Sequence, residues 1–211
     1  MGRSEQIDTF SRYSQVSRET IISLKEYESL LIRANKNLNL IGNSTINHIW
    51  HRHFLDSAQV IDLIDENQKT LVDIGSGAGF PGLVLSILDK WRKNSIKIKL
   101  IDKSPKKINF LEEVIRKLNL NATAINQNVN DEKFSFHDEV FVVRAFKPLT
   151  EILELIHNKA KNFKNIIIFL GKSAEVELLQ ASKKWDIKYK KRMSVTSNDS
   201  MILKINYIKK K

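Results

Sequence analysis

The sequence predicts an α/β fold in which helices cover both faces of a mostly parallel, seven-stranded sheet. From residue 70 onward, short apolar runs alternate with segments of helical periodicity, as expected when parallel strands are joined by helices. A glycine-rich turn, residues 75–82, directly follows the first apolar run. The last two apolar runs, 187–193 and 201–208, have no helix between them. They indicate a closing hairpin with an antiparallel last strand.

The first 65 residues predict a helical extension. Apolar residues recur at three- and four-residue steps before a polar break at 39–44, at Leu24, Tyr27, Leu31, Ala34 and Leu38. A second helix is expected on the apolar positions between 46 and 61. Because no Pro- or Gly-rich linker follows, the extension should pack on the rest of the chain. We therefore expect an N-terminal helical extension, 1–65, and a main domain, 66–211.

The main domain is expected to hold five parallel strands with helices between them. Each strand is a short, mostly β-branched or aliphatic run: 71–74, 96–102, 122–125, 140–143 and 166–170. The helices show amphipathic spacing, at 81–91, 105–118, 149–162 and 174–184. Pro81 suits the first turn of the first of these helices.

Composition and charge limit the class of protein. With 211 residues, 42% hydrophobic and 28% charged, the chain can bury a core of its own. Lys and Arg exceed Asp and Glu by 35 to 24, which favours a polyanionic partner such as nucleic acid, although solubility alone is an alternative. The absence of Cys excludes disulfides, thiolate metal sites and cysteine nucleophiles. The longest aliphatic run, 166–170, is too short to span a bilayer, and we expect a cytoplasmic protein.

The most informative stretch is 73–82, Asp-Ile-Gly-Ser-Gly-Ala-Gly-Phe-Pro-Gly. Gly75, Gly77 and Gly79 allow positive φ angles and a close approach of a ligand to the main chain. The acid at Asp73 suits a cationic or hydroxyl-bearing ligand better than a pyrophosphate. This pattern predicts S-adenosylmethionine as the cofactor.

Polar residues after the next two strands complete the predicted cofactor crevice. In doubly wound sheets, ligands lie beyond the carboxyl ends of the strands. Asp102 could accept hydrogen bonds from two ribose hydroxyls, and residues 126–130 could meet an adenine edge. Residues 77–82 also fit the G-x-G-x-x-G pattern of nicotinamide enzymes. That pattern fits poorly. Two residues separate its first glycine, Gly77, from the expected end of the strand, and the loop contains the bulky Phe80 and Pro81. In addition, Asp102 lies 25 residues beyond Gly77, whereas the acid of that pattern lies about 20 residues on.

Several motifs together resemble one family. Besides 73–82, they are Asn-Leu-Ile at 39–41, His-Phe-Leu-Asp-Ser at 53–57, the Asp-to-Leu segment 102–111 and Val-Arg-Ala-Phe at 143–146. In this order they resemble the motifs of the RsmG (GidB) family, methyltransferases of bacterial 16S ribosomal RNA. The resemblance covers about residues 35–175 and is far more specific than a lone glycine loop.

The resemblance implies a class I S-adenosylmethionine-dependent methyltransferase fold, which is Rossmann-like. It implies that N7 of guanine 527 in 16S ribosomal RNA, free or in the small subunit, is methylated. It implies cofactor contacts at Gly75, Phe80, Val129, Asn130 and Arg144, and we expect a monomer without an obligate protein partner. This chain departs from the family where Val-Asn at 129–130 replaces Ala-Glu, and where the lysine after the fifth strand shifts to position 172.

Ring-nitrogen methylation agrees with what the sequence lacks. N7 carries a lone pair and no proton, so no general base is needed, and a pyrimidine C5 methylase would need a cysteine. The segment Arg-Ala-Phe-Lys-Pro at 144–148 also lacks the Pro-Pro-aromatic turn of amine methylases. Arg144 is the candidate positioning residue, anchoring cofactor, phosphate or guanine, with a structural ion pair as the alternative. Phe80 and Phe146 could stack on a base or only pack the loop.

Other interpretations remain open at this point. His48, His51 and His53 invite a metal, but only Asp56 lies nearby as a further ligand, so we predict none. The alternatives to an RNA methyltransferase of this specificity are another nucleic-acid or small-molecule methyltransferase of the same fold, a nicotinamide dehydrogenase and a non-catalytic RNA-binding protein.

Overall fold

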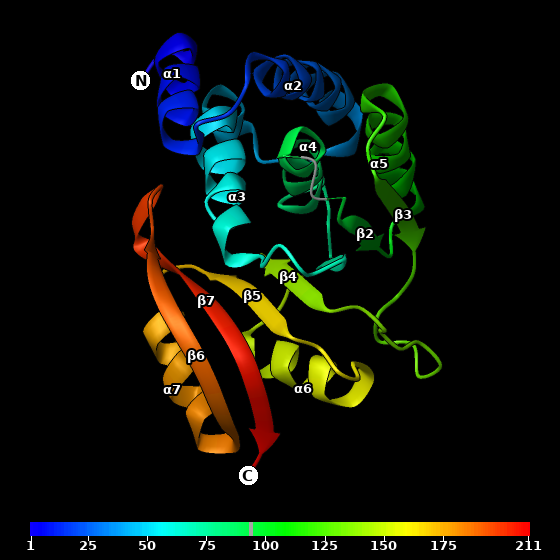
Figure 1. Cartoon of the computed structure of the whole chain (residues 1–211), viewed down its shortest axis with the longest axis vertical. Coiled ribbons are helices and arrows are strands. Elements are labelled where there is room, and N and C mark those ends of the chain that lie inside the picture. The colour runs from blue at the N-terminus through cyan, green and yellow to red at the C-terminus, as the bar shows by residue number, and fades with distance from the viewer. Residues whose placement is uncertain (93–94) are drawn as a thin grey trace.

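The computed structural model describes residues 1–92 and 95–211, and a seven-stranded sheet forms its centre (Figure 1). The strand order is β3-β2-β1-β4-β5-β7-β6. The first five strands pair in parallel, and β7 is antiparallel to both β5 and β6. This confirms the predicted sheet. The strands are β1 Thr70–Ile74, β2 Lys97–Asp102, β3 Ala122–Asn126, β4 Val140–Arg144, β5 Asn165–Leu170, β6 Trp185–Ser194 and β7 Ser197–Lys210.

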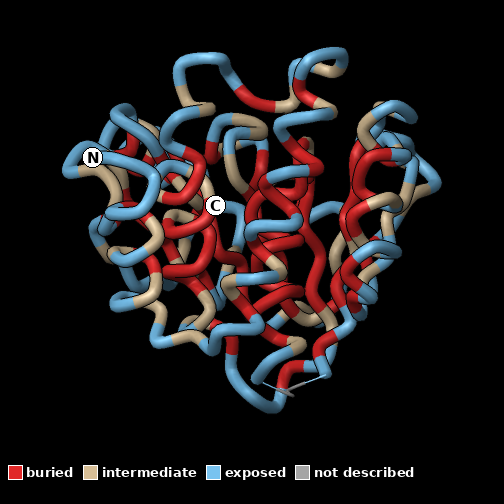
Figure 2. The backbone as a smooth tube through the Cα atoms, turned by 90° about the horizontal axis from the view of Figure 1, so that it is seen from above, coloured by how far each residue is buried: buried red, intermediate tan, exposed pale blue. Residues whose placement is uncertain are grey.

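Helices cover both faces of the sheet and separate two hydrophobic clusters. On one face lie α4 (Gly82–Arg92) and α5 (Pro105–Leu118), and on the other lie α6 (Leu149–Lys159) and α7 (Ala174–Lys184) (Figure 1). Figure 2 shows the buried segments gathered inside the molecule and the exposed ones around them. The central strands β1, β4 and β5 are buried almost throughout. Such strands lack a polar face, as expected for a parallel sheet covered on both sides.

The N-terminal helices α1 (Arg3–Ser14) and α2 (Arg18–Leu38) pack on the α4–α5 side of the sheet. Ser17 caps α2 by accepting a hydrogen bond from the Thr20 N–H, and Asn39 ends it in the left-handed conformation. Phe10, Leu24 and Tyr27 belong to the same hydrophobic cluster as the apolar residues of α4 and α5. The predicted extension therefore shares a core with the main domain, and a boundary at residue 65 stays a prediction.

The prediction of one regular helix over 46–61 is wrong. The segment instead consists of a 3₁₀-helix η1 (Asn43–His48), a π-helical stretch η2 (Trp50–Leu55), a short α3 (Asp56–Ala58) and a 3₁₀ turn η3 (Ile61–Leu63). The wide π-helical stretch buries Trp50, Phe54 and Leu55 while Arg52 stays exposed. Periodicity alone could not reveal this, because a π-helical turn shifts the buried face by one residue.

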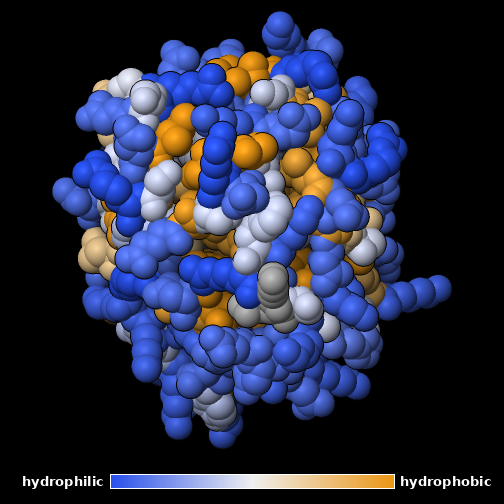
Figure 3. All heavy atoms as spheres, turned by 45° about the horizontal axis from the view of Figure 1, so that its top comes forward, coloured by the Kyte–Doolittle hydropathy of each residue, from blue (hydrophilic) through white to orange (hydrophobic). Residues whose placement is uncertain are grey.

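The face of the molecule seen in Figure 3 is mostly hydrophilic. On the face seen in Figure 3, apolar side chains show only in small groups between polar ones. Within residues 1–92 and 95–211, no helix is long and apolar enough to cross a membrane.

Candidate functional site

The glycine loop follows β1 and needs its glycines for two different reasons. Gly75, Gly77 and Gly79 have φ angles of +74°, +58° and +100°, which residues with a Cβ rarely adopt. Space matters as well, because a Cβ on Gly75 would lie 2.4 Å from Cδ2 of Phe146. The loop is thus shaped by backbone conformation and by the ring packed against it.

The end of β2 holds this loop in place. The N–H groups of Gly75 and Ser76 donate to the Ile101 carbonyl at 2.9 and 3.0 Å. The Asp102 carboxylate accepts the Gly77 N–H at 3.0 Å and the Ser104 N–H at 2.9 Å. Asp102 therefore joins the turns that follow two neighbouring strands.

A cavity of about 330 Å³ opens at these strand ends, and we call it the strand-end cavity. Four of the predicted cofactor residues line it, namely Gly75, Asp102, Val129 and Asn130, together with Phe146. Its volume lies in the range of small-molecule sites. Its polar donors and acceptors fit an adenosine-bearing cofactor, because the Asp102 carboxylate can accept hydrogen bonds from ribose hydroxyls.

Asn130 stands at the family's acidic position. Its side-chain oxygen accepts a hydrogen bond from the Lys147 ammonium at 3.3 Å, and Lys147 also pairs with Glu151 at 3.1 Å. The amide thus remains in the cavity wall as a neutral group that can both donate and accept hydrogen bonds.

Asp73 does not line the strand-end cavity, contrary to the expectation that this acid faces the ligand. It is fully buried behind the loop, and its Oδ2 accepts the Gly82 N–H at 2.9 Å. Its Oδ1 has no hydrogen-bond partner among the described residues. Burial raises the pKa of Asp73 to about 7. Through its hydrogen bond to Gly82, Asp73 stabilises the start of α4 and does not face the cavity.

Gly77, Gly79 and Phe80 also lie outside the lining of this cavity. The Phe80 ring is buried and stacks on His53, with ring centroids 4.8 Å apart. Next to it, Tyr27 of α2 donates its hydroxyl proton to the Ala78 carbonyl at 2.6 Å. The far side of the glycine loop thus packs against the N-terminal helices, and a direct cofactor contact of Phe80 stays a prediction.

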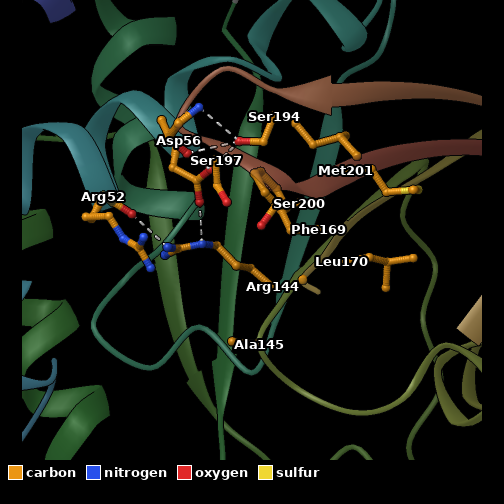
Figure 4. A pocket seen from close by; sticks show the side chains of 13 residues that line it. Arg52, Asp56, Arg144, Ala145, Phe169, Leu170, Ser194, Ser197, Ser200 and Met201 are labelled. Carbon is orange, nitrogen blue, oxygen red and sulfur yellow. Dashed lines mark hydrogen bonds and ion pairs between the residues drawn. The ribbon is translucent and has the colours of Figure 1, made fainter. Parts of the chain in front are cut away.

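Arg144 lies at the end of β4, is not part of the lining of the strand-end cavity, and points toward Asp56 and Arg52 (Figure 4). Its Nε pairs with Asp56 at 2.9 Å, and an Nη donates to the Arg52 carbonyl at 2.9 Å. The other Nη lies 3.4 Å from Nδ1 of His53. The ion pair that was the alternative for Arg144 is therefore present, and its cofactor contact stays a prediction.

Asp56 is the residue that sequence reasoning missed. Besides Arg144, its carboxylate accepts hydrogen bonds from Gln59 at 2.8 Å, Thr196 at 2.8 Å and Ser194 at 3.2 Å. The available signal was its place in the His-x-x-Asp-Ser motif, but nothing in the sequence shows that the turn between β6 and β7 returns to it.

A second cavity of about 380 Å³ lies beside Arg144, and we call it the Arg144 pocket. Arg144 and Asp56 form one side, the end of β5 another, and the β6–β7 turn a third (Figure 4). Ala145 lines both this pocket and the strand-end cavity, and its φ of +50° marks the sharp turn of the chain after β4. The two cavities are thus neighbours across one residue.

In the described part of the chain, no group of three His, Cys, Asp or Glu side chains is placed to hold a metal ion. Burial and the charges of Arg144 and Arg52 lower the pKa of His53 to about 3. His53 is therefore a neutral ring beside the guanidinium at physiological pH.

Comparisons with known proteins agree with this geometry. The model of the GidB family, described as rRNA small subunit methyltransferase G, matches residues 20–205. A curated protein named ribosomal RNA small subunit methyltransferase G from Pelagibacter ubique is 39% identical over 198 residues, covering 93% of this chain and 92% of that protein. The protein of the same name from Rickettsia akari is 36% identical over 196 residues, covering 93% and 98%.

Solved structures show the same fold at lower identity. A SAM-dependent methyltransferase from Aquifex aeolicus superimposes with a TM-score of 0.57 at 19% identity, covering 83% of this chain and 97% of that one. TrmK from M. capricolum, solved with S-adenosyl-homocysteine, gives a TM-score of 0.52 at 22% identity, covering 71% and 66%. These likenesses confirm the class I methyltransferase fold.

Proposed function

This chain belongs to the GidB family, rRNA small subunit methyltransferase G, and we propose that it methylates N7 of guanine 527 in 16S ribosomal RNA. The enzyme is a methyltransferase that uses S-adenosylmethionine. The strand-end cavity is the observation that carries the proposal. Four predicted residues from the carboxyl ends of three different strands line it together: Gly75, Asp102, Val129 and Asn130.

Each wall of this cavity has a proposed task. Asp102 accepts the two ribose hydroxyls, and it is already oriented by the Gly77 and Ser104 N–H groups. Gly75 and the Phe146 ring packed against it line the same wall, where the cofactor would meet the glycine loop. Val129 and Asn130 face the adenine, and the amide of Asn130 offers a donor and an acceptor where the family has a carboxylate.

The proposed methyl transfer depends on how the base and the cofactor are positioned. Bound S-adenosylmethionine supplies a methyl group on a positively charged sulfur. Because guanine N7 has a free lone pair and no proton, the protein does not need to remove one. Its residues have to hold the base and the cofactor in line and exclude water, and such positioning supplies up to roughly 7–11 kcal/mol in well-oriented reactions. With its pKa lowered to about 3, His53 is a weak base, which agrees with a reaction that needs no proton acceptor.

We propose that the substrate is 16S RNA, free or in the small subunit, and that the enzyme acts as a cytoplasmic monomer. The excess of 35 Lys and Arg over 24 Asp and Glu supports a polyanionic substrate. A nicotinamide dehydrogenase is disfavoured by family membership as well as by the loop sequence.

Gly75→Ala tests the cofactor site. Because the added methyl would lie 2.4 Å from the Phe146 ring and φ is +74°, affinity for S-adenosylmethionine should fall at least about tenfold in isothermal titration. Gly42→Ala is the matched control, since its Cβ would meet nothing closer than 3.9 Å. Unchanged affinity in Gly75→Ala would show that the cofactor binds elsewhere.

The reaction itself is tested by methyl transfer to 16S RNA and to small subunits, followed by mapping of N7-methylguanine. The modification should be present in cells with this gene and absent in cells without it. Binding of NAD without any sulfonium compound would contradict the proposal. Cofactor binding without methyl transfer to RNA or subunits would favour a non-catalytic RNA-binding protein.

A further inference from the structure

We infer that His53 is a positioning residue, which orients the Arg144 guanidinium and joins it to the glycine loop. This inference rests on the proposed function and deepens it, because it assigns a task in methyl transfer to a side chain that lines neither cavity. His53 therefore acts through its neighbours, which are Arg144 on one side and Phe80 on the other.

All three nitrogen atoms of the Arg144 guanidinium have a partner in one short segment, residues 52–56. Nε pairs with the Asp56 carboxylate at 2.9 Å, one Nη donates to the Arg52 carbonyl at 2.9 Å, and the other Nη lies 3.4 Å from Nδ1 of His53. Most of this segment belongs to the π-helical stretch η2, and such stretches are rare and recur at functional sites. The Asp56 carboxylate balances the charge of Arg144, whereas the neutral ring of His53 fixes the direction of the guanidinium without changing the charge.

The hydrogen bonds around His53 determine which ring nitrogen carries the proton. A guanidinium has no acceptor, so Nδ1 of His53 has to accept the Arg144 N–H and is itself unprotonated. The ring proton is then on Nε2, which lies 3.0 Å from Oγ1 of Thr45. Thr45 donates its own hydroxyl proton to the Gly42 carbonyl at 2.8 Å, so its oxygen can accept from Nε2. The hydrogen bonds from Arg144 through His53 and Thr45 to Gly42 therefore all run in one direction, and the other tautomer of His53 would break two of them.

The face of the His53 ring packs against the glycine loop. It stacks on Phe80 with an angle of 17° between the ring planes, and the guanidinium carbon of Arg144 lies 5.9 Å from the centre of the same Phe80 ring. Phe80 is itself buried and packs against Tyr27 and Phe54, with ring centroids 5.6 and 6.0 Å away. A displacement of the glycine loop would therefore move His53 and, with it, Arg144.

The position of Arg144 makes this connection important for methyl transfer. Arg144 lines the Arg144 pocket, and the next residue, Ala145, lines both cavities. Gly75, in the same loop as Phe80, lines the strand-end cavity. His53 thus connects these two parts of the site from behind. Because it lines neither cavity, its loss should lower kcat more than it weakens the binding of cofactor or RNA.

His53→Asn and His53→Gln form the decisive pair, because both remove the ring and its stacking on Phe80. The asparagine amide stands at the place of Nδ1 and keeps an acceptor for Arg144, whereas the longer glutamine places its amide at Nε2 and keeps only the contact with Thr45. We expect His53→Gln to lower kcat about 100-fold, since misplacement of a reacting group by about 1 Å has such an effect, and His53→Asn to keep most of the rate. The KM for 16S RNA and the affinity for S-adenosylmethionine should change little in either variant. Equal kcat values for the two variants would overturn the inference, because the hydrogen bond to Arg144 would then be irrelevant.

A double-mutant cycle with Arg144→Lys shows whether His53 acts through Arg144. Lysine keeps a positive charge beside Asp56, but its single ammonium cannot hold three separate contacts in one plane. In the Arg144→Lys background, His53→Gln should therefore cause little further loss of kcat. The same loss in both backgrounds would mean that His53 supports the fold and not Arg144. His48→Gln is the matched control, because His48 is exposed at the end of η1, and it should keep the wild-type kcat.

The tautomer of His53 provides a test that does not depend on activity. NMR of the protein with ¹⁵N-labelled histidine should show His53 as the neutral Nε2–H form near neutral pH, with its signals assigned by their loss in His53→Gln. An Nδ1–H tautomer or a protonated ring in the wild type would overturn the inference. A wild type that shows the Nε2–H form but transfers no methyl group to RNA would refute the proposed function and leave the orientation of Arg144 by His53 standing.

Discussion

Asp73 and Asp102 lie near the carboxyl ends of neighbouring strands but have different surroundings, because two backbone N–H groups orient Asp102 whereas Asp73 is fully buried. Asp102 accepts two backbone N–H groups and lines the strand-end cavity. Asp73 accepts the Gly82 N–H with its carboxylate, and burial raises its pKa to about 7. A carboxyl that is partly protonated at neutral pH can sit in an apolar layer where a permanent charge could not.

The raised pKa of Asp73 predicts a pH dependence of stability. Its unfolded pKa is about 3.9, so between about pH 4 and 7 the folded chain binds a proton that the unfolded chain has lost. The stability that Asp73 contributes is therefore complete below about pH 4 and is lost as the pH rises to about 7.

Asp73→Asn should remove this dependence, so its stability relative to the wild type should increase from pH 4 to pH 7. Urea unfolding at several pH values measures the difference. Asp62→Asn serves as the control, since Asp62 is exposed and pairs only at the surface with Arg192. A constant difference between Asp73→Asn and the wild type would show that Asp73 titrates normally in the folded chain.

At the scale of elements, α2 supports the glycine loop from behind. Its Tyr27 is fully buried, and the hydroxyl reaches the Ala78 carbonyl from 51 residues away in the sequence. A Cβ on Gly79 would lie 2.9 Å from this same hydroxyl. The loop conformation therefore depends on an N-terminal helix as well as on its own glycines.

Tyr27→Phe should destabilise the chain by about 1–3 kcal/mol, because it leaves a buried carbonyl without a donor. Affinity for S-adenosylmethionine should fall as well, since the loop is released. Urea unfolding and isothermal titration measure the two effects. Tyr13→Phe should change neither, because Tyr13 lies in α1 and is 45% exposed. Wild-type behaviour of Tyr27→Phe would mean that the loop holds its shape alone.

The regular elements were predictable because local signals determined them. The helices 105–118 and 174–184 have the predicted bounds, and six strands agree with the prediction within two residues, whereas β7 begins four residues earlier than expected. The stretch 46–61 was not predictable as it is, because its π-helical turn follows from tertiary packing of Trp50 and Phe54. The same limit applies to the site, where the direction of Arg144 depends on Asp56, 88 residues earlier.

For the whole molecule, positive charge around two cavities predicts a strong effect of salt on RNA binding but not on cofactor binding. Raising the salt concentration should weaken RNA binding with a log–log slope of about 0.7–0.9 per phosphate contact. Arg52→Gln should reduce this slope by roughly one contact, whereas Lys36→Gln, on exposed α2 surface, should not. Equal slopes for both variants would place the RNA away from the Arg144 pocket.

The outer strands of the sheet have a consequence of a different kind. The sheet ends at β3, which has only five residues, and at β6, which has ten. A long open edge can add a strand from another molecule and start aggregation. On β6, Lys188, Lys190 and Lys191 are exposed. Repulsion between such lysines on two copies opposes edge-to-edge pairing, so part of the basic charge keeps the protein dispersed even when no RNA is bound.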